Sequence, residues 1–198
     1  MGGVTRAPID EDDLDARVFI NDEVDFVATA RWFEDLTGDP HPDDAASTAM
    51  LLVLAGGYLA LAGQHEAALQ RYQQAVADGG VCTPDARCSL LAGLLEVGRD
   101  DEAAVLAAEI KRDRLPDPEV YQYVGEAYET RGDLATATHW FTAGLVRFLH
   151  DDDVADFAVE LLATGRRRVR RAQGFPMDEY DELAEEMHEA HYEDVELD

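Results

Sequence analysis

The chain has 198 residues, 46% of them hydrophobic, and its 43 acidic and 16 basic residues give a formal net charge of −27. This composition can bury a core, so it excludes disorder throughout and fits one domain of average size. The charge disfavours nucleic acid and anionic membranes as partners, because their phosphates would be repelled. A cationic partner fits better.

The acidity is concentrated at the two ends of the chain. Residues 1–60 hold 13 acids and 3 bases, and residues 176–198 hold 11 acids and no base. Salt adaptation usually coats a whole surface, so this distribution argues mildly against it as the full explanation. We expect residues 1–20 to be an acidic, flexible segment. They resemble neither a secretory signal nor a transit peptide, so a cytoplasmic location is the default.

The first predicted helix belongs to an N-terminal capping segment over residues 21–43. The stretch NDEVDFVATARWFEDL (21–36) has the apolar spacing of an amphipathic helix, with Asn21 or Asp22 as its N-cap. Such a helix could cover the apolar flank of the helices that follow.

An uncharged stretch, AASTAMLLVLAGGYLALAGQH, lies between Asp44 and Glu66. Its 21 residues are long enough for a membrane span, but its flanks are acidic and lack the Lys or Arg that orient one. We therefore predict a helix apolar on all sides, covered by the 21–36 helix, by the next helices or by a second subunit.

Regularly spaced glycines indicate repeated helical hairpins. Gly63, Gly98 and Gly132 are separated by 35 and 34 residues, and Gly165 follows 33 residues later. Each comes between two stretches with helical periodicity, where a left-handed glycine ends a helix. The first three are followed, five residues on, by Ala68, Ala103 and Ala137, small residues that allow paired helices to approach closely. Pro84 and Pro118 are expected in first helical turns, each beside an acid.

The clearest copy, YQYVGEAYETRGDLATATHWFTAGL, resembles the tetratricopeptide repeat. The matching positions are Tyr121, Val124, Gly125, Tyr128, Ala137 and Phe141. The first copy matches at Gly56, Leu59, Ala68, Tyr72 and Ala75. The middle copy matches at Leu94 and Ala103 but has Leu91 where a small residue is expected and Ala107 where an aromatic is expected.

The resemblance implies an all-α, right-handed solenoid of three to four hairpins with a capping helix at each end. Three repeats would occupy residues 44–150. A partial fourth repeat with an arginine cluster would occupy residues 151–175, and an acidic capping helix residues 176–198. Solenoids need such caps because a terminal repeat has a bare apolar flank.

The same resemblance implies a binding groove lined by the first helix of each repeat. The groove positions are Met50, Val53, Leu54, Asp85, Glu119, Gln122, Tyr123, Glu126 and Glu129. One end is apolar and the other acidic, which fits a basic or amphipathic protein segment as partner. Two alternatives stay open: the glutamates are simply a solvated helical face, or the apolar first hairpin forms a homodimer.

Five arginines form a basic patch: Arg166, Arg167, Arg168, Arg170 and Arg171. They could pair with the acidic C-terminal segment, which follows after a short loop, or form a partner surface. A third interpretation is a regulatory accessory subunit that binds a phosphorylated or nucleic-acid ligand there. Proximity favours pairing with the chain's own acids.

The sequence offers little for catalysis. His188 and His191 are three residues apart, whereas metalloprotease histidines are four apart, so we predict no metal site there. The cysteines Cys82 and Cys88 are interpreted as small buried residues. We expect a protein–protein interaction module without catalytic residues or a cofactor.

Overall fold

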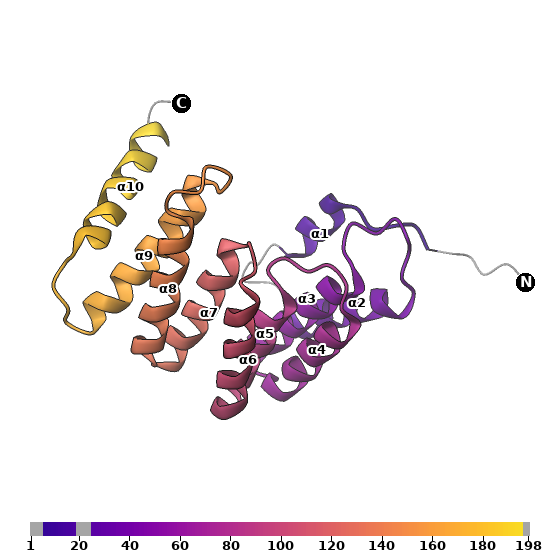
Figure 1. The fold of residues 1–198 in the computed structure, drawn as a ribbon. Helices are drawn as coiled ribbons and strands as arrows, with labels where there is room; N and C mark the ends of the chain where they lie inside the picture. The colour runs from indigo at the N-terminus through magenta and orange to yellow at the C-terminus, as the bar shows by residue number, and fades with distance from the viewer. Residues whose placement is uncertain (1–5, 19–24, 196–198) are drawn as a thin grey trace, which may run out of the picture. The chain divides into compact units, whose positions relative to one another are not determined.

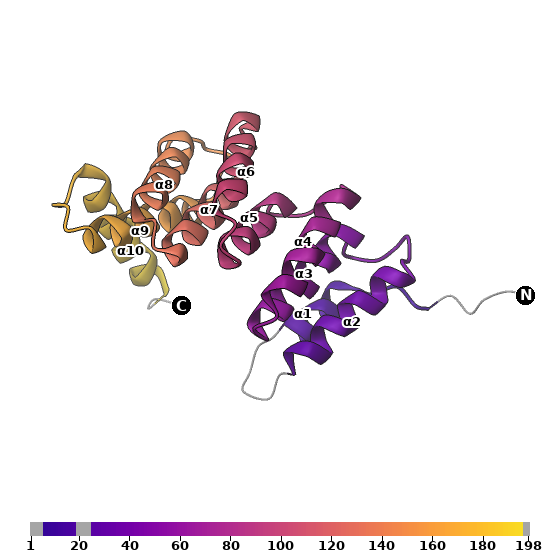
Figure 2. The same cartoon turned by 90° about the horizontal axis from the view of Figure 1, so that it is seen from below.

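The computed structural model describes residues 6–18 and 25–195, and the side chains of residues 6–17 and 25–187 (Figures 1 and 2). Within these ranges every regular element is an α-helix, which confirms the all-α class. The chain divides into two compact units, Met1–Arg99 and Asp100–Asp198, where we expected one domain. The predicted second hairpin is thereby divided, with its first helix in one unit and its second helix in the other.

The first unit contains five helices. They are α1 (Glu11–Val18), α2 (Phe26–Gly38), α3 (Thr48–Leu61), α4 (His65–Asp78) and α5 (Ala86–Glu96). Helix α3 packs between α2 and α4, and α5 packs on α4 and also contacts α3. The predicted capping helix is thus α2, which begins after the N-cap Asp25. The predicted caps Asn21 and Asp22 lie outside the described residues.

The second unit also contains five helices. They are α6 (Asp100–Asp113), α7 (Pro118–Arg131), α8 (Leu134–Phe148), α9 (Asp156–Ala172) and α10 (Glu179–Val195). Helices α7 and α8 form a hairpin, α9 packs on both of them, and α10 packs on α9 (Figure 1). An ion pair of 2.9 Å between Arg131 and Asp100 joins α7 to α6. The helix predicted for the C-terminal segment is present as α10 and packs on α9.

Three of the four predicted turn glycines have the expected backbone. Gly63, Gly98 and Gly132 have φ angles of +74°, +76° and +88°. The prediction for Gly165 was wrong: this residue is buried inside α9, and the turn after α9 uses Gly174 at φ +76°. Residues 156–172 are therefore one continuous helix.

Glycine is needed at position 165 because an aromatic ring packs directly against the helix backbone there. A Cβ atom on Gly165 would lie 2.6 Å from Phe141 of α8, and a Cβ on Gly125 of α7 would lie 2.8 Å from the same ring. Both distances are shorter than real contacts allow, so the ring fits only between two glycines. Phe141 is completely buried there.

Tyr72 of α4 has the same arrangement in the first unit. Its ring contacts Gly56 of α3, and a Cβ on Gly93 of α5 would lie 2.8 Å from it. Gly93 thus supplies the small residue that the repeat pattern placed at Leu91, which is itself fully buried. Burial, with the charge of Glu96, raises the pKa of Tyr72 to about 12, so its hydroxyl stays neutral.

The segment expected to be flexible at the N-terminus contains α1, and its described residues are bonded to the rest of the first unit. The Asp44 carboxylate pairs with the Arg6 guanidinium and accepts hydrogen bonds from the backbone N–H groups of Ile9 (3.0 Å) and His41 (2.9 Å). Tyr58 donates its hydroxyl hydrogen to the Arg17 carbonyl at 3.0 Å. The Arg6 hydrogen bond, ahead of the two backbone bonds, holds the pKa of Asp44 well below its usual value.

The uncharged stretch forms α3 and its turn. Helix α3 has 14 residues, and among the described residues no helix has the length and apolar character needed to span a bilayer. The chain itself covers α3 with α2, α4 and α5, while Ile9 and Leu14 of the N-terminal segment join the same apolar cluster. The two prolines expected in first helical turns differ in outcome. Pro118 is the first residue of α7, as predicted, whereas Pro84 lies before α5, whose N-cap is Asp85.

Adjacent glycines in α3 provide a matched test of the ring contact. Gly56→Ala would push a methyl group into Tyr72, whereas nothing lies within 4 Å of a Cβ on Gly57. We expect Gly56→Ala to lower the free energy of unfolding by about 1–3 kcal/mol. We expect Gly57→Ala to raise it by about 0.5–1 kcal/mol through helix propensity. Urea titrations of both variants measure this, and equal effects would refute the ring contact.

Candidate protein-interaction surfaces

Helix α7 has one buried face and one polar face. Asp117 caps the helix by accepting the Glu119 N–H at 2.9 Å, and Pro118 takes the first position. Its inward side chains are Val120, Tyr121, Val124 and Tyr128. The Tyr121 hydroxyl accepts a hydrogen bond of 2.7 Å from Arg147 of α8. This packing fixes the helix and leaves the predicted groove residues on its other side.

The polar face of α7, defined as Glu119, Gln122, Tyr123, Glu126 and Glu129, combines carboxylates with one aromatic ring. Tyr123 is 45% exposed and is the aromatic residue of this face. Gln122 donates a hydrogen bond of 3.1 Å to Glu126. Glu119 is exposed and forms no ion pair with any side chain the structure describes.

Glu129 differs from the other glutamates because it is already neutralised. Its two carboxylate oxygens accept hydrogen bonds of 2.7 and 2.6 Å from Nε and Nη2 of Arg168 in α9. This bidentate geometry is the favoured one for Arg and carboxylate. The acidic character of the face is therefore strongest toward Glu119 and weakest at Glu129.

The groove residues predicted from α3 are less open. Val53 and Leu54 are half-buried and pack against two separate apolar clusters of the first unit. The Met50 sulfur lies 4.0 Å from the sulfur of Cys82. These side chains therefore contribute to packing within their own unit, and this part of the predicted groove is largely covered by the chain itself.

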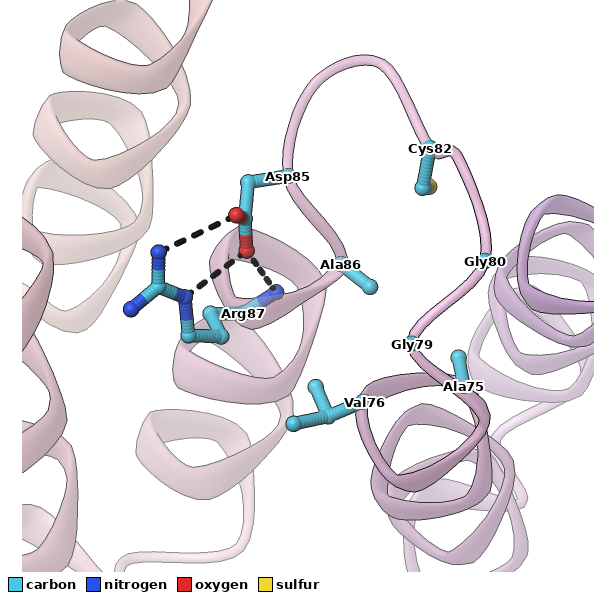
Figure 3. Close-up of a pocket in the computed structure, with 8 residues that line it drawn as sticks. All are labelled: Ala75, Val76, Gly79, Gly80, Cys82, Asp85, Ala86 and Arg87. Carbon is cyan, nitrogen blue, oxygen red and sulfur yellow. Dashed lines mark hydrogen bonds and ion pairs between the residues drawn. The ribbon is translucent and has the colours of Figure 1, made fainter. Parts of the chain in front are cut away.

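Asp85 lines a pocket of about 200 Å³ between the end of α4 and the start of α5 (Figure 3). Its carboxylate accepts hydrogen bonds of 2.9 Å from both the backbone N–H and Nε of Arg87, so it acts as a helix cap. Burial, and secondarily the Asp85 charge, raises the pKa of Cys82 to about 11, so the thiol stays protonated and unreactive. The Asp-x-Arg spacing at a helix start could have indicated this local pair.

Four of the five arginines in the basic patch pair with acids of the same chain. Arg168 pairs with Glu129 of α7, as described above, and Arg167 pairs with Glu185 of α10. Arg166 and Arg170 both contact Asp178 and Asp181 at distances of 2.6–3.0 Å. Arg171 is exposed and forms no ion pair among the described side chains. Three of the arginines therefore pair with the acidic C-terminal segment, as their proximity in the sequence favoured.

Arg166 is the centre of this network. Its side chain is only 6% exposed, and its Nε donates to Thr142 of α8 at 3.1 Å. Its guanidinium also lies 5.1 Å from the ring centre of Tyr180. Burial alone would lower the pKa of Arg166, but the hydrogen bonds that it donates to Asp178 and the charges of Asp178 and Asp181 outweigh burial and raise the pKa. The arginine therefore stays charged, with partners for every nitrogen.

The described side chains include no group of three potential metal ligands. His188 and His191 lie outside those side chains. His139 of α8 contacts Lys111 of α6, which joins two helices of the second unit. Comparison of the chain with family models, with curated proteins and with solved structures finds no match.

The Arg166–Asp178 pair predicts a pH dependence of stability. The hydrogen bond from Arg166, chiefly, lowers the pKa of Asp178 from 3.8 to about 2. The resulting stabilisation is complete above pH 4 and is lost as the pH falls through 2. We therefore expect Asp178→Asn to destabilise the protein by a constant amount at neutral pH, with the difference vanishing near pH 2. Urea titrations of both proteins across this range measure it, and a difference independent of pH would contradict the pairing.

Proposed function

We propose that the chain is a tetratricopeptide-like interaction protein without catalytic activity. It binds a basic or amphipathic segment of a partner protein on the polar face of α7. The observation that carries this proposal is Tyr123, an aromatic side chain left 45% exposed among carboxylates on a helix whose other face is firmly packed.

The repeat architecture is supported by several local features. Each turn glycine, at Gly63, Gly98 and Gly132, has the left-handed backbone that ends a helix. The alanines five residues further on are at most 1% exposed, as close helix packing requires. Helix α9 packs on both helices of the preceding hairpin, which is how a stack of hairpins grows.

The α7 face has complementary groups for a cationic segment with an apolar side chain. Exposed tyrosines are frequent energetic centres of interfaces because they bury a large area with little loss of side-chain entropy. The carboxylates of Glu119 and Glu126 lie on the same helix and would accelerate encounter with lysine or arginine groups. Arg168 would mark the end of the site, since it neutralises Glu129.

Self-association has weaker support. We considered it because the first hairpin is apolar and its surface has to be buried. Helices of the same unit already bury α3, so no second subunit is required for this. Sedimentation velocity of the full chain distinguishes the two modes, because binding through α7 requires no dimer.

A cationic amphipathic helical peptide of Leu and Lys, labelled with a fluorophore, is a suitable probe for the full chain. We expect Tyr123→Ala to weaken binding by about 5- to 30-fold, corresponding to 1–2 kcal/mol for an interface centre. We expect Glu126→Lys to slow association and to reduce its dependence on salt. Fluorescence anisotropy and stopped-flow mixing provide both measurements.

Asp153→Lys is the matched control, since it makes the same charge change at an exposed acid in the loop before α9. It should have only the small effect of a change in net charge. If Tyr123→Ala binds as the unmodified chain does and Glu126→Lys behaves like Asp153→Lys, the site is not on α7.

A further inference from the structure

The side of α9 that faces α10 carries a row of arginines. Arg166 and Arg170 are one helical turn apart, and Arg167 lies beside them. Their guanidinium groups point at carboxylates of α10 and of the residue before it. We call Arg166, Arg167 and Arg170 the arginine row.

The acidic groups opposite the arginine row have helical spacing. Asp178, Asp181 and Glu185 are three and four residues apart, which places them on one face of α10. Asp178 and Asp181 also cap this helix, because each side chain accepts a hydrogen bond from the other's backbone N–H, at 3.2 and 3.3 Å. The same two carboxylates thus cap the N-terminus of α10 and bind the arginines.

Docking of α10 depends mainly on these polar contacts. Among its described side chains only Asp181 and Ala184 are buried, while Tyr180, Leu183 and Met187 are half-buried. The connection before α10 exposes Phe175 and Met177, each by 52%. A helix held by few apolar contacts opens more readily than a core helix. The Arg166–Asp181 pair is buried, but the Arg167–Glu185 pair is partly exposed, at 34% and 44%, so salt weakens it.

We propose that the arginine row is a docking site for an acidic helix, that α10 occupies this site within the chain, and that an acidic helix of a partner protein binds there when α10 is released. The ligand class is defined by carboxylates at positions i, i+3 and i+7 of one helix face. This inference is independent of the proposed binding to α7, which uses other residues and the opposite charge.

The shape of the site favours a helix over a phosphate polymer. The Arg166 guanidinium is recessed, with 6% of its side chain exposed, and it is shared between two carboxylates from adjacent helical turns. The Tyr180 ring lies against it, and Ala184 is buried in the same contact region. An aromatic ring and a small apolar residue are features that an acidic helix offers and a phosphate chain lacks.

The test uses the full chain and a labelled peptide with the sequence of residues 177–195. In the unmodified chain α10 competes with the peptide at the high effective concentration that a short connection imposes. We expect Asp178→Asn combined with Asp181→Asn to release α10 and to tighten peptide binding at least tenfold. Adding Arg167→Glu should remove this gain, and raising the salt concentration should weaken binding.

Glu182→Gln combined with Glu186→Gln is the matched control. Both residues are exposed on α10, and the change in net charge is the same. Peptide binding by this control should equal that of the unmodified chain. An equal gain in both double variants would overturn the proposal, because net charge alone would then explain it.

A second variant tests the proposal without removing the carboxylates that pair with the buried Arg166. Tyr180→Ala with Glu185→Gln weakens docking but keeps both aspartates on Arg166 and should also bind the peptide more tightly than the unmodified chain. Circular dichroism checks that each variant is folded. If the folded variants do not bind the peptide, or bind a labelled oligonucleotide or polyphosphate more tightly than the peptide, the proposal is wrong.

Discussion

The contact on which both units depend is an aromatic ring held between two glycines of neighbouring helices. Phe141 is flanked by Gly125 and Gly165, and Tyr72 by Gly56 and Gly93. A glycine lets the ring approach a helix backbone, and two glycines let one ring join three successive helices. Since protein interiors are close-packed, a methyl group at any of these positions requires a helix to move. Helices so fixed can present defined outer faces.

Electrostatic pairing determines which charges of this acidic chain face solvent. The second unit uses most of its basic patch internally: Arg168 binds Glu129 across to α7, while Arg166 and Arg170 bind the start of α10. A cluster of five cations in the sequence therefore leaves only Arg171 exposed and unpaired among the described side chains. On the polar face of α7, Glu119 is exposed and forms no ion pair with any side chain that the structure describes.

Local patterns predicted most of the helices and three of the turns, because turn glycines and apolar periodicity act over a few residues, but the second predicted hairpin is divided between the two units. Gly165 was misinterpreted for a physical reason: glycine serves both turns and close packing, and its contact partner Phe141 is 24 positions away. Helix α1 was missed because EDDLDARV has little apolar character, and what stabilises its segment comes from Asp44 and Tyr58. The coverage of Val53 and Leu54 depends on packing against residues distant in the sequence, which no local pattern reveals.

The hydrogen bond between Arg6 and Asp44 spans 38 residues, and the one between Arg168 and Glu129 spans 39. Both contacts lie within a single unit, so each unit supplies both partners of its own pair. Domains generally fold as units, and synthesis starts at the N-terminus, so the first unit can begin to fold once residue 99 has left the ribosome. Its helices can therefore close around Tyr72 while the second half of the polypeptide is still being translated, so that two units fold in the order in which they are made.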